Sequence, residues 1–245
     1  AGRQVNALWE RPDFRRAAGD AWRPGGVALT CRALDRCAAS GWLRPGGLVL
    51  DMGSGAGATL RLLAERGYRA VGLDKHADAA ALADENWAGT CALVCADIAQ
   101  PPLAAASADC VLCECVLSLL ADPLAALRAG HAALRPGGVL VVSDLMLRQG
   151  YASAPADSGL GGVGSSCLAG ARAQDEWRGI MEAAGFTLAY FEDNSRALVE
   201  LAARMVWYGD ADTGQGKGCA CGGAAPGKNL RAYGYGLWIA RKEIL

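Results

Sequence analysis

Short hydrophobic runs alternate with stretches of helical periodicity along the middle of the chain. The hydrophobic runs lie at 48–51, 69–74, 91–97, 109–114 and 138–144. Alanine-rich segments with leucines at helical spacing separate several of them, at 59–67, 77–88 and 122–134. Strands that alternate with helices are typical of a parallel sheet that carries helices on both faces. The pattern therefore predicts an α/β fold of the Rossmann-like kind.

The flanking segments extend this prediction in both directions. A helix is predicted over 28–43, ending near Gly41, because small and polar residues interrupt its hydrophobic face there. Downstream the pattern predicts a helix, a strand, a helix and a last strand, at 172–185, 186–193, 195–209 and 231–243. We expect that last strand to be antiparallel, in a sheet that is otherwise mostly parallel.

Composition and charge narrow the class of protein. Hydrophobic residues make up 52% of the 245 residues, which favours a folded core over disorder. The net charge of -1 argues against nucleic acid or an anionic membrane as the partner. No hydrophobic run reaches the length of a membrane span, and no secretory signal opens the chain. We therefore predict a cytoplasmic location, with reduced cysteines.

A glycine-rich turn follows the first predicted strand in "LVLDMGSGAGATL". Gly53 and Gly55 permit a sharp bend and a close approach of the backbone to a ligand. Asp51, Asp74 and Asp97 end the first three predicted strands. Since the carboxyl ends of parallel strands meet at one edge of a sheet, these acids are expected to line one crevice.

The predicted ligand carries a cation, a ribose diol and a hydrogen-bond-donating base, since Asp51 would repel a pyrophosphate. S-adenosylmethionine meets these requirements: Asp51 would attract its ammonium, Asp74 would accept from the ribose hydroxyls, and Asp97 from the adenine amino group. An NAD enzyme is the alternative, because the turn also fits a dinucleotide fingerprint. Ser54, Lys75 and Ile98 adjoin these residues and complete the candidate cofactor site.

The segments "LDMGSGAG", "GLD", "CADI", "DCVLCECVLSLL" and "LRPGGVLVVSD" resemble, in this order, a class I S-adenosylmethionine-dependent methyltransferase. The resemblance implies a single methyltransferase domain over 1–245. Its parts would be an N-terminal arm or lid and helix (1–45), a cofactor-binding core (46–150) and a C-terminal part with acceptor-site cysteine loops (151–245). The expected partner is a small-molecule methyl acceptor.

Six of the ten cysteines lie in predicted helices or strands, where a free cysteine behaves as a small hydrophobic residue. Cys115 lies beside Glu114 at the predicted mouth of the crevice, and its role stays open. Cys167, Cys219 and Cys221 instead lie in loops among glycine and polar residues. Three thiolates would suit a soft acceptor such as trivalent arsenic, whereas a zinc site would need a fourth ligand. A disulfide is a further alternative. We predict no metal cofactor.

A second, narrower resemblance bears on these cysteines. "GSSCLAGARAQDEWRGIMEAAGF" and "ECVLSLLADPLAALRAGHAALRPGG" are similar to segments of arsenite methyltransferases. The resemblance implies that Cys167 and a later cysteine, Cys219 or Cys221, bind arsenic, and a thiol such as glutathione is a candidate partner. Three features depart from that family: Ala58 and Thr59 stand where it carries a cysteine, Glu114 replaces an asparagine, and the C-x-C arrangement is unusual.

Glu114 is a fourth candidate catalytic residue, because it follows the fourth strand at the predicted mouth of the crevice. It would orient the substrate or act as a base. Two alternatives to thiolate-bound methylation stay open. One is a methyltransferase for an ordinary carbon, nitrogen or oxygen acceptor, with structural or zinc-binding cysteines. The other is a cofactor-binding sensor of metal or redox state that catalyses no reaction.

Overall fold

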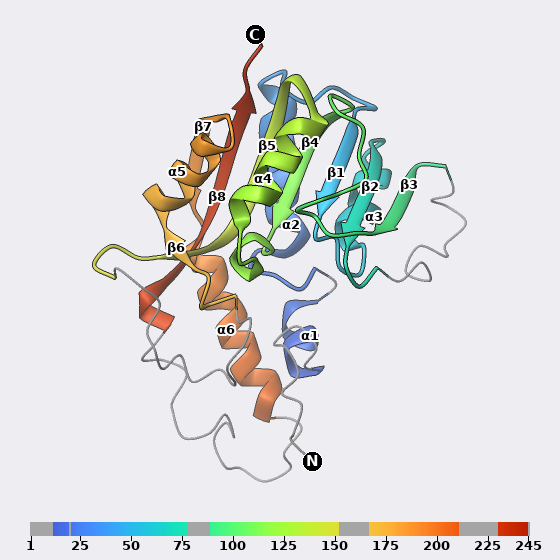
Figure 1. Cartoon of the computed structure of the whole chain (residues 1–245). Coiled ribbons are helices and arrows are strands. Elements are labelled where there is room, and N and C mark those ends of the chain that lie inside the picture. The colour runs from blue at the N-terminus through green and yellow to red at the C-terminus, as the bar shows by residue number, and fades with distance from the viewer. Residues whose placement is uncertain (1–11, 20, 78–88, 152–166, 211–229, 245) are drawn as a thin grey trace, which may run out of the picture.

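The computed structural model describes residues 12–19, 21–77, 89–151, 167–210 and 230–244. Its strands form one sheet in the order β3-β2-β1-β4-β5-β8-β7, and β6 pairs with β5 outside this path (Figure 1). The strands are β1 Leu48–Met52, β2 Arg69–Asp74, β3 Cys91–Cys95, β4 Ala108–Glu114, β5 Leu134–Leu147, β6 Arg172–Ala173, β7 Phe186–Asp193 and β8 Tyr233–Lys242. The pairs among β1 to β6 are parallel, whereas β8 runs antiparallel to β5 and β7. The predicted α/β fold with an antiparallel last strand is confirmed.

Helices cover both faces of the sheet. They are α1 Pro12–Ala18, α2 Gly26–Ala39, α3 Ala58–Glu65, α4 Pro123–Ala133, α5 Gln174–Ala183 and α6 Ser195–Asp210, with short 3-10 turns η4 Leu117–Leu119 and η5 Leu230–Ala232. Side chains of α2 and α3 belong to one core cluster, and those of α4 and α5 to another on the opposite face. Figure 1 shows α4 and α5 in front of the sheet and α2 behind it.

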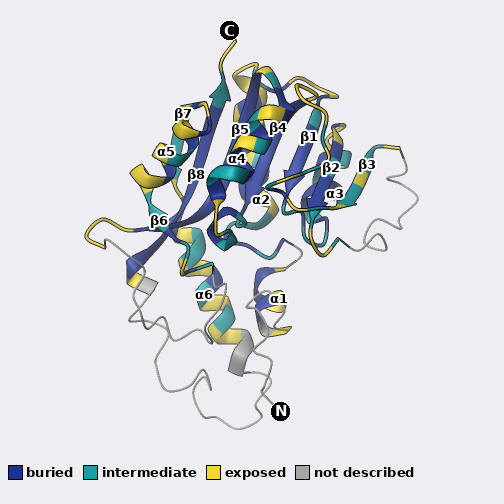
Figure 2. Cartoon of the chain, in the orientation of Figure 1, coloured by how far each residue is buried: buried dark blue, intermediate teal, exposed yellow. Residues whose placement is uncertain are grey.

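The central strands are buried on both faces, which explains their unbroken hydrophobic sequence. In β4, Cys110 and Leu112 pack on the α2 side, while Val111 and Cys113 pack on the α4 side. All seven residues of β4 are buried, and Figure 2 shows the same dark core along β5 and β8. Apolar area removed from water on both faces is the main stabilising contribution of this sheet.

Two local features differ from the sequence-based expectations. The two-residue strand β6 was not predicted, since so short an element carries no periodicity. Strand β5 begins at Leu134, before the hydrophobic run at 138–144, because Leu134 already pairs with Ala108 and the register shifts after that pair. Most of the helix predicted at 77–88 lies outside the described residues.

The carboxyl ends of the parallel strands lie together at one edge of the sheet, as this topology requires. Helices α1 and α6 pack against each other beyond that edge (Figure 1). Their contact buries Phe14 and Ala17 of α1 against Leu201 of α6. Within the described ranges, no helix is both long and apolar enough to cross a membrane.

Candidate functional site

The glycine turn after β1 is fixed by backbone bonds to the end of β2. The amides of Gly53 and Ser54 donate to the Leu73 carbonyl at 2.7 and 3.1 Å. Gly53 has a φ of +87°, and a Cβ there would lie 2.5 Å from Val116 Cγ2, so this position accepts only glycine. A Cβ on Gly55 would meet nothing within 4 Å. The backbone at Gly55 is therefore open to a ligand.

Asp74 joins the glycine turn to the segment after β2. One carboxylate oxygen accepts from the Gly55 amide at 3.0 Å and the other from the His76 amide at 2.8 Å. Each oxygen has a second lone pair for a further donor. Two oxygens held side by side next to an open backbone suit the recognition of a ribose diol.

The candidate adenine end contains Lys75, Asp97 and Ile98. Asp97 accepts from the Ala99 amide at 3.0 Å and pairs with Lys75 Nζ at 3.1 Å. Its pKa is lowered, first by the Ala99 hydrogen bond and then by Lys75. Ile98 is 4% exposed and belongs to the core. The adenine contact of Asp97 stays a prediction.

Asp51 has an unsatisfied carboxylate oxygen at the end of β1. The residue is 2% exposed, and its Oδ2 has no hydrogen-bond partner among the described residues. Its pKa is raised from 3.8 to about 8, chiefly by burial and also by Glu114 and Asp74, while Arg23 lowers it. A buried carboxylate without a partner is costly, so this oxygen fits a cationic ligand group.

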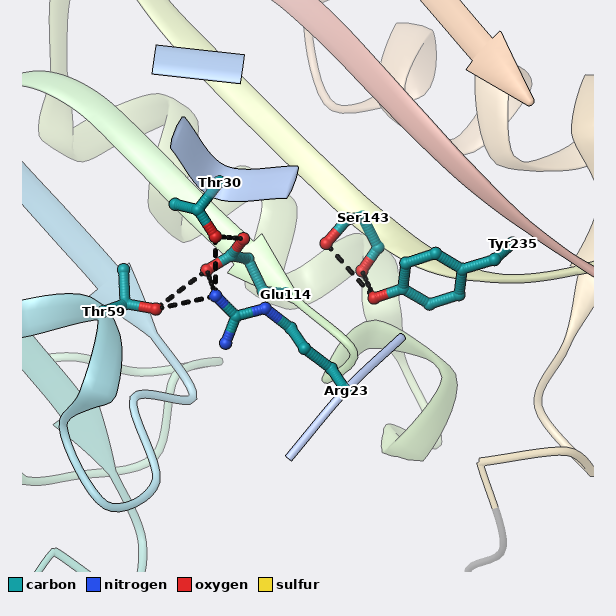
Figure 3. A network of polar contacts seen from close by, with 6 residues as sticks. All are labelled: Arg23, Thr30, Thr59, Glu114, Ser143 and Tyr235. Atoms are coloured by element: carbon teal, nitrogen blue, oxygen red, sulfur yellow. Dashed lines mark hydrogen bonds and ion pairs between the residues drawn. The ribbon is translucent and has the colours of Figure 1, made fainter. Parts of the chain in front are cut away.

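Glu114 lies at the centre of a buried polar network that the sequence did not reveal (Figure 3). Its Oε1 accepts from the Thr30 hydroxyl at 2.7 Å, and its Oε2 accepts from the Thr59 hydroxyl at 3.0 Å. Arg23 Nη2 lies 2.8 Å from Oε2 and donates to both threonines, at 2.6 and 3.0 Å. We call Arg23, Thr30, Thr59 and Glu114 the Glu114 network.

The Glu114 network joins three parts of the chain at the end of β4. Arg23 precedes α2, Thr30 lies on α2, and Thr59 lies in the first turn of α3, directly after the glycine turn. Both oxygens of Glu114 thus already have donors within the protein, which favours an orienting role over proton abstraction. One sequence signal could have indicated Arg23. The sequence contains Arg-Pro-Gly-Gly three times, and the copy at 23–26 leads into a helix, whereas the copies at 44–47 and 135–138 precede or lie within a strand.

Cys115 and Cys167 come together at the ends of β4 and β5. Cys115 has a φ of +56°, unusual for a residue with a side chain, and its amide donates to the Ser143 carbonyl at 2.7 Å. The Tyr235 hydroxyl donates to the same Ser143 (Figure 3). Burial raises the pKa of Cys167 to about 12, and burial together with nearby Asp144 and Cys167 raises that of Cys115.

A close backbone approach holds the turn that carries Cys167. A Cβ on Gly170 would lie 1.9 Å from the Ser118 carbonyl oxygen, so only glycine allows this contact. Ser118 is in turn fixed by Asp144, which accepts from its hydroxyl at 2.6 Å and its amide at 3.1 Å. Since Asp144 ends the hydrophobic run of β5, the Cys167 turn is tied to the strand ends.

The other cysteines have mixed environments. Cys37, Cys110 and Cys113 are buried in the core, as expected for packing residues, but Cys95 is exposed. Cys219 and Cys221 lie outside the described residues. In the part of the chain that the structure describes, no three histidine, cysteine or acidic side chains are grouped to hold a metal ion.

Known proteins match this chain in its central part. Residues 50–142 match the family model of the methyltransferase domain. The chain is 29% identical over 152 residues to an arsenite methyltransferase of Halobacterium salinarum, covering 59% of this chain and 38% of that protein. It is 34% identical over 132 residues to malonyl-[acyl-carrier protein] O-methyltransferase of Serratia marcescens, covering 54% and 51%. The matched part of the chain thus spans about half of one relative's length and less of the other's.

A solved structure supports the same fold. Phosphoethanolamine N-methyltransferase 2 of Haemonchus contortus, in complex with phosphomonomethylethanolamine and S-adenosylhomocysteine, superposes with a TM-score of 0.74 at 19% identity, over 94% of this chain and 56% of that one. The match over residues 50–142 and the fold support the predicted class I S-adenosylmethionine-dependent methyltransferase domain.

The residues present fit the cofactor of this class. The open backbone at Gly55, the paired oxygens of Asp74 and the unsatisfied oxygen of Asp51 lie along one edge of the sheet. The carboxylate oxygens can accept hydrogen bonds from a ribose diol and from an ammonium group. These groups support S-adenosylmethionine as the predicted cofactor, and the detailed contacts of the predicted site residues stay predictions.

Proposed function

We propose that the protein is an S-adenosylmethionine-dependent methyltransferase that acts on a small, soft acceptor such as trivalent arsenic. In this proposal Cys167 binds the acceptor together with Cys219 or Cys221. The observation that carries it is the position of Cys167: a glycine-specific contact at Gly170 ties its turn to the strand ends beside the candidate cofactor residues. The 29% identity to an arsenite methyltransferase supports the same choice of acceptor.

When bound, S-adenosylmethionine supplies a methyl group activated by a sulfonium. The chain's own residues then have to bind and orient the cofactor and the acceptor, and they have to exclude water. In this proposal Asp74 binds the ribose hydroxyls and Asp51 binds the ammonium of the amino-acid part. Gly53 and Gly55 let the backbone approach the cofactor closely. The Glu114 network keeps α2 and α3 in place around them.

A soft acceptor suits the chemistry of this site because it needs no general base. Each thiol that binds arsenite replaces one hydroxide, and the thiol proton leaves with that hydroxide as water. The arsenic would keep a lone pair for the new bond to the methyl carbon, and the methyl–sulfur bond of the cofactor would break in exchange, giving S-adenosylhomocysteine. Glu114, whose oxygens already accept from Arg23 and two threonines, is then not required as a base. A thiol such as glutathione would serve as the partner.

Methylation of an ordinary oxygen or nitrogen acceptor is the second candidate. It is favoured by the activities of two similar proteins, an O-methyltransferase and an N-methyltransferase. In this case Cys115 and Cys167 would act as packing residues, which agrees with their raised pKa values.

Labelled methyl transfer separates these candidates. Wild type, Cys167→Ser and the control Cys95→Ser are incubated with labelled S-adenosylmethionine, glutathione and either arsenite or a panel of small oxygen and nitrogen acceptors. We expect labelled arsenic from wild type and the control, with a loss of at least about 100-fold in Cys167→Ser, as for a residue that acts directly on the acceptor. Equal transfer to arsenite by wild type and Cys167→Ser would refute the thiolate role.

A further inference from the structure

Arg23 is a buried guanidinium whose hydrogen-bonding capacity is only partly used. The residue is 8% exposed. Among the described residues, its side-chain hydrogen bonds and its ion pair all involve Nη2, as the dashed lines of Figure 3 show. Its Nε is buried and has no partner in the described part of the chain. A guanidinium offers five N–H donors, and the Nε–H donor of Arg23 is left unsatisfied.

Asp51, which lies near Arg23, has an unsatisfied acceptor instead of an unsatisfied donor. Its buried Oδ2 is an acceptor without a donor. Arg23 and Asp51 interact electrostatically, but no hydrogen bond or ion pair joins these two side chains in the structure. An unsatisfied buried donor and an unsatisfied buried acceptor each cost free energy. A ligand that carries an acceptor group and a donor group close together would satisfy both Arg23 Nε and Asp51 Oδ2 at once.

The α-amino acid group is such a ligand: its ammonium donates and its carboxylate accepts. We propose that Arg23 binds the α-carboxylate of the methionine part of S-adenosylmethionine, opposite the ammonium bound by Asp51. This inference rests on the proposed function and adds a binding residue from the N-terminal segment to the cofactor site. The contacts of Arg23 with Glu114 and the two threonines all use Nη2, so the Nε–H donor remains available.

The local charges support this assignment. Arg23 is paired with Glu114 at 2.8 Å, so the pair contributes no net charge. When Asp51 is ionised it supplies a negative charge for the ammonium, and the Arg23 Nε–H supplies a donor for the carboxylate. A zwitterion is thus recognised at both of its ends. Arginine suits this task because it stays charged when buried and forms charge-assisted hydrogen bonds with carboxylates.

The test compares two ligands that differ only in the carboxylate: S-adenosylmethionine and its decarboxylated form. Dissociation constants are measured by calorimetry for wild type and Arg23→Gln. We expect wild type to prefer the carboxylated ligand by roughly 10- to 100-fold, the range for a charge-assisted hydrogen-bond pair. In Arg23→Gln this preference should fall to within about 3-fold of unity, while affinity for the decarboxylated ligand stays close to that of wild type.

Two further variants separate binding from a merely structural role. Glu114→Gln keeps the Arg23 fork and should keep the preference for the carboxylated ligand. The double variant Arg23→Gln/Glu114→Gln removes both charges, which avoids a buried carboxylate without a counter-ion, and it should lose the preference. Arg32→Gln serves as the matched control, because Arg32 pairs with Glu192 and Asn194 outside the Glu114 network.

The outcomes distinguish this inference from the proposed function. Wild type that binds neither ligand nor S-adenosylhomocysteine would contradict the proposed function itself. Wild type that prefers the carboxylated ligand, together with Arg23 variants that keep the same preference, would overturn only the role of Arg23. An equal loss of affinity for both ligands in the Arg23 variants would also overturn it, since that result indicates a structural contribution.

Discussion

The protonation of Asp51 makes cofactor affinity depend on pH. Its pKa is about 8 in the free protein because burial disfavours the charged form, and Glu114 and Asp74 add to this effect against the opposing Arg23. An ammonium ligand requires the carboxylate to be ionised. Below pH 8 the protein must therefore release one proton for each ligand bound, and affinity should fall about tenfold per pH unit.

The expected size of the effect follows directly. At pH 6 only about 1% of Asp51 is ionised for a pKa near 8, so affinity should be roughly 100-fold below its plateau above pH 9. Calorimetric titration with S-adenosylhomocysteine between pH 6 and 9 measures this slope. Repeating it in buffers of different ionisation enthalpy counts the released protons, and about one is expected near pH 6.5.

Asp51→Asn is the matched variant, since it keeps the shape of the side chain but cannot ionise. It should bind weakly at every pH and show no slope between pH 6 and 8. A flat wild-type profile over this range, or an equal slope in Asp51→Asn, would show that Asp51 does not bind the cofactor's cation.

Three further perturbations have expected outcomes. Gly53→Ala should destabilise the protein by about 1–3 kcal/mol and weaken S-adenosylhomocysteine binding at least about 10-fold, because its Cβ would lie 2.5 Å from Val116 Cγ2; thermal unfolding and calorimetry measure both. Gly170→Ala should lower the free energy of unfolding by about 2–3 kcal/mol, because the Ser118 carbonyl occupies the space of the new Cβ; urea denaturation measures it. Glu114→Gln should cost about 3 kcal/mol in the same assay, because it breaks a buried ion pair.

Control variants make these expectations refutable. Gly179→Ala, at a site in α5 where a Cβ meets nothing within 4 Å, should be neutral or stabilising by about 0.5–1 kcal/mol. Gly55→Ala meets no neighbour within 4 Å, so it should impair ligand binding more than packing. If Gly170→Ala were as stable as Gly179→Ala, the close contact that positions the Cys167 turn would be wrong.

The sequence by itself determined the order and kind of the central elements. Strands such as β4 and β5 are buried on both faces, so they appear as continuous hydrophobic runs, and the acids that follow them mark the ends of the strands. The glycines at 53 and 55 were recognisable because a tight turn between a strand and a helix excludes larger residues. These signals are local in sequence, and they were enough to predict the fold class and the cofactor.

Only the tertiary structure decided which distant side chains meet. Arg23, Thr30 and Thr59 join Glu114 across separations of up to 91 residues, as their numbering shows. No periodicity or spacing encodes such a contact, because it depends on how α2 and α3 pack against the end of β4. Packing also decides the close approach of Gly170 to Ser118 and the position of the unsatisfied Arg23 Nε near Asp51. The sequence specified the residues capable of this chemistry, and packing of the sheet and helices determined which of them act together.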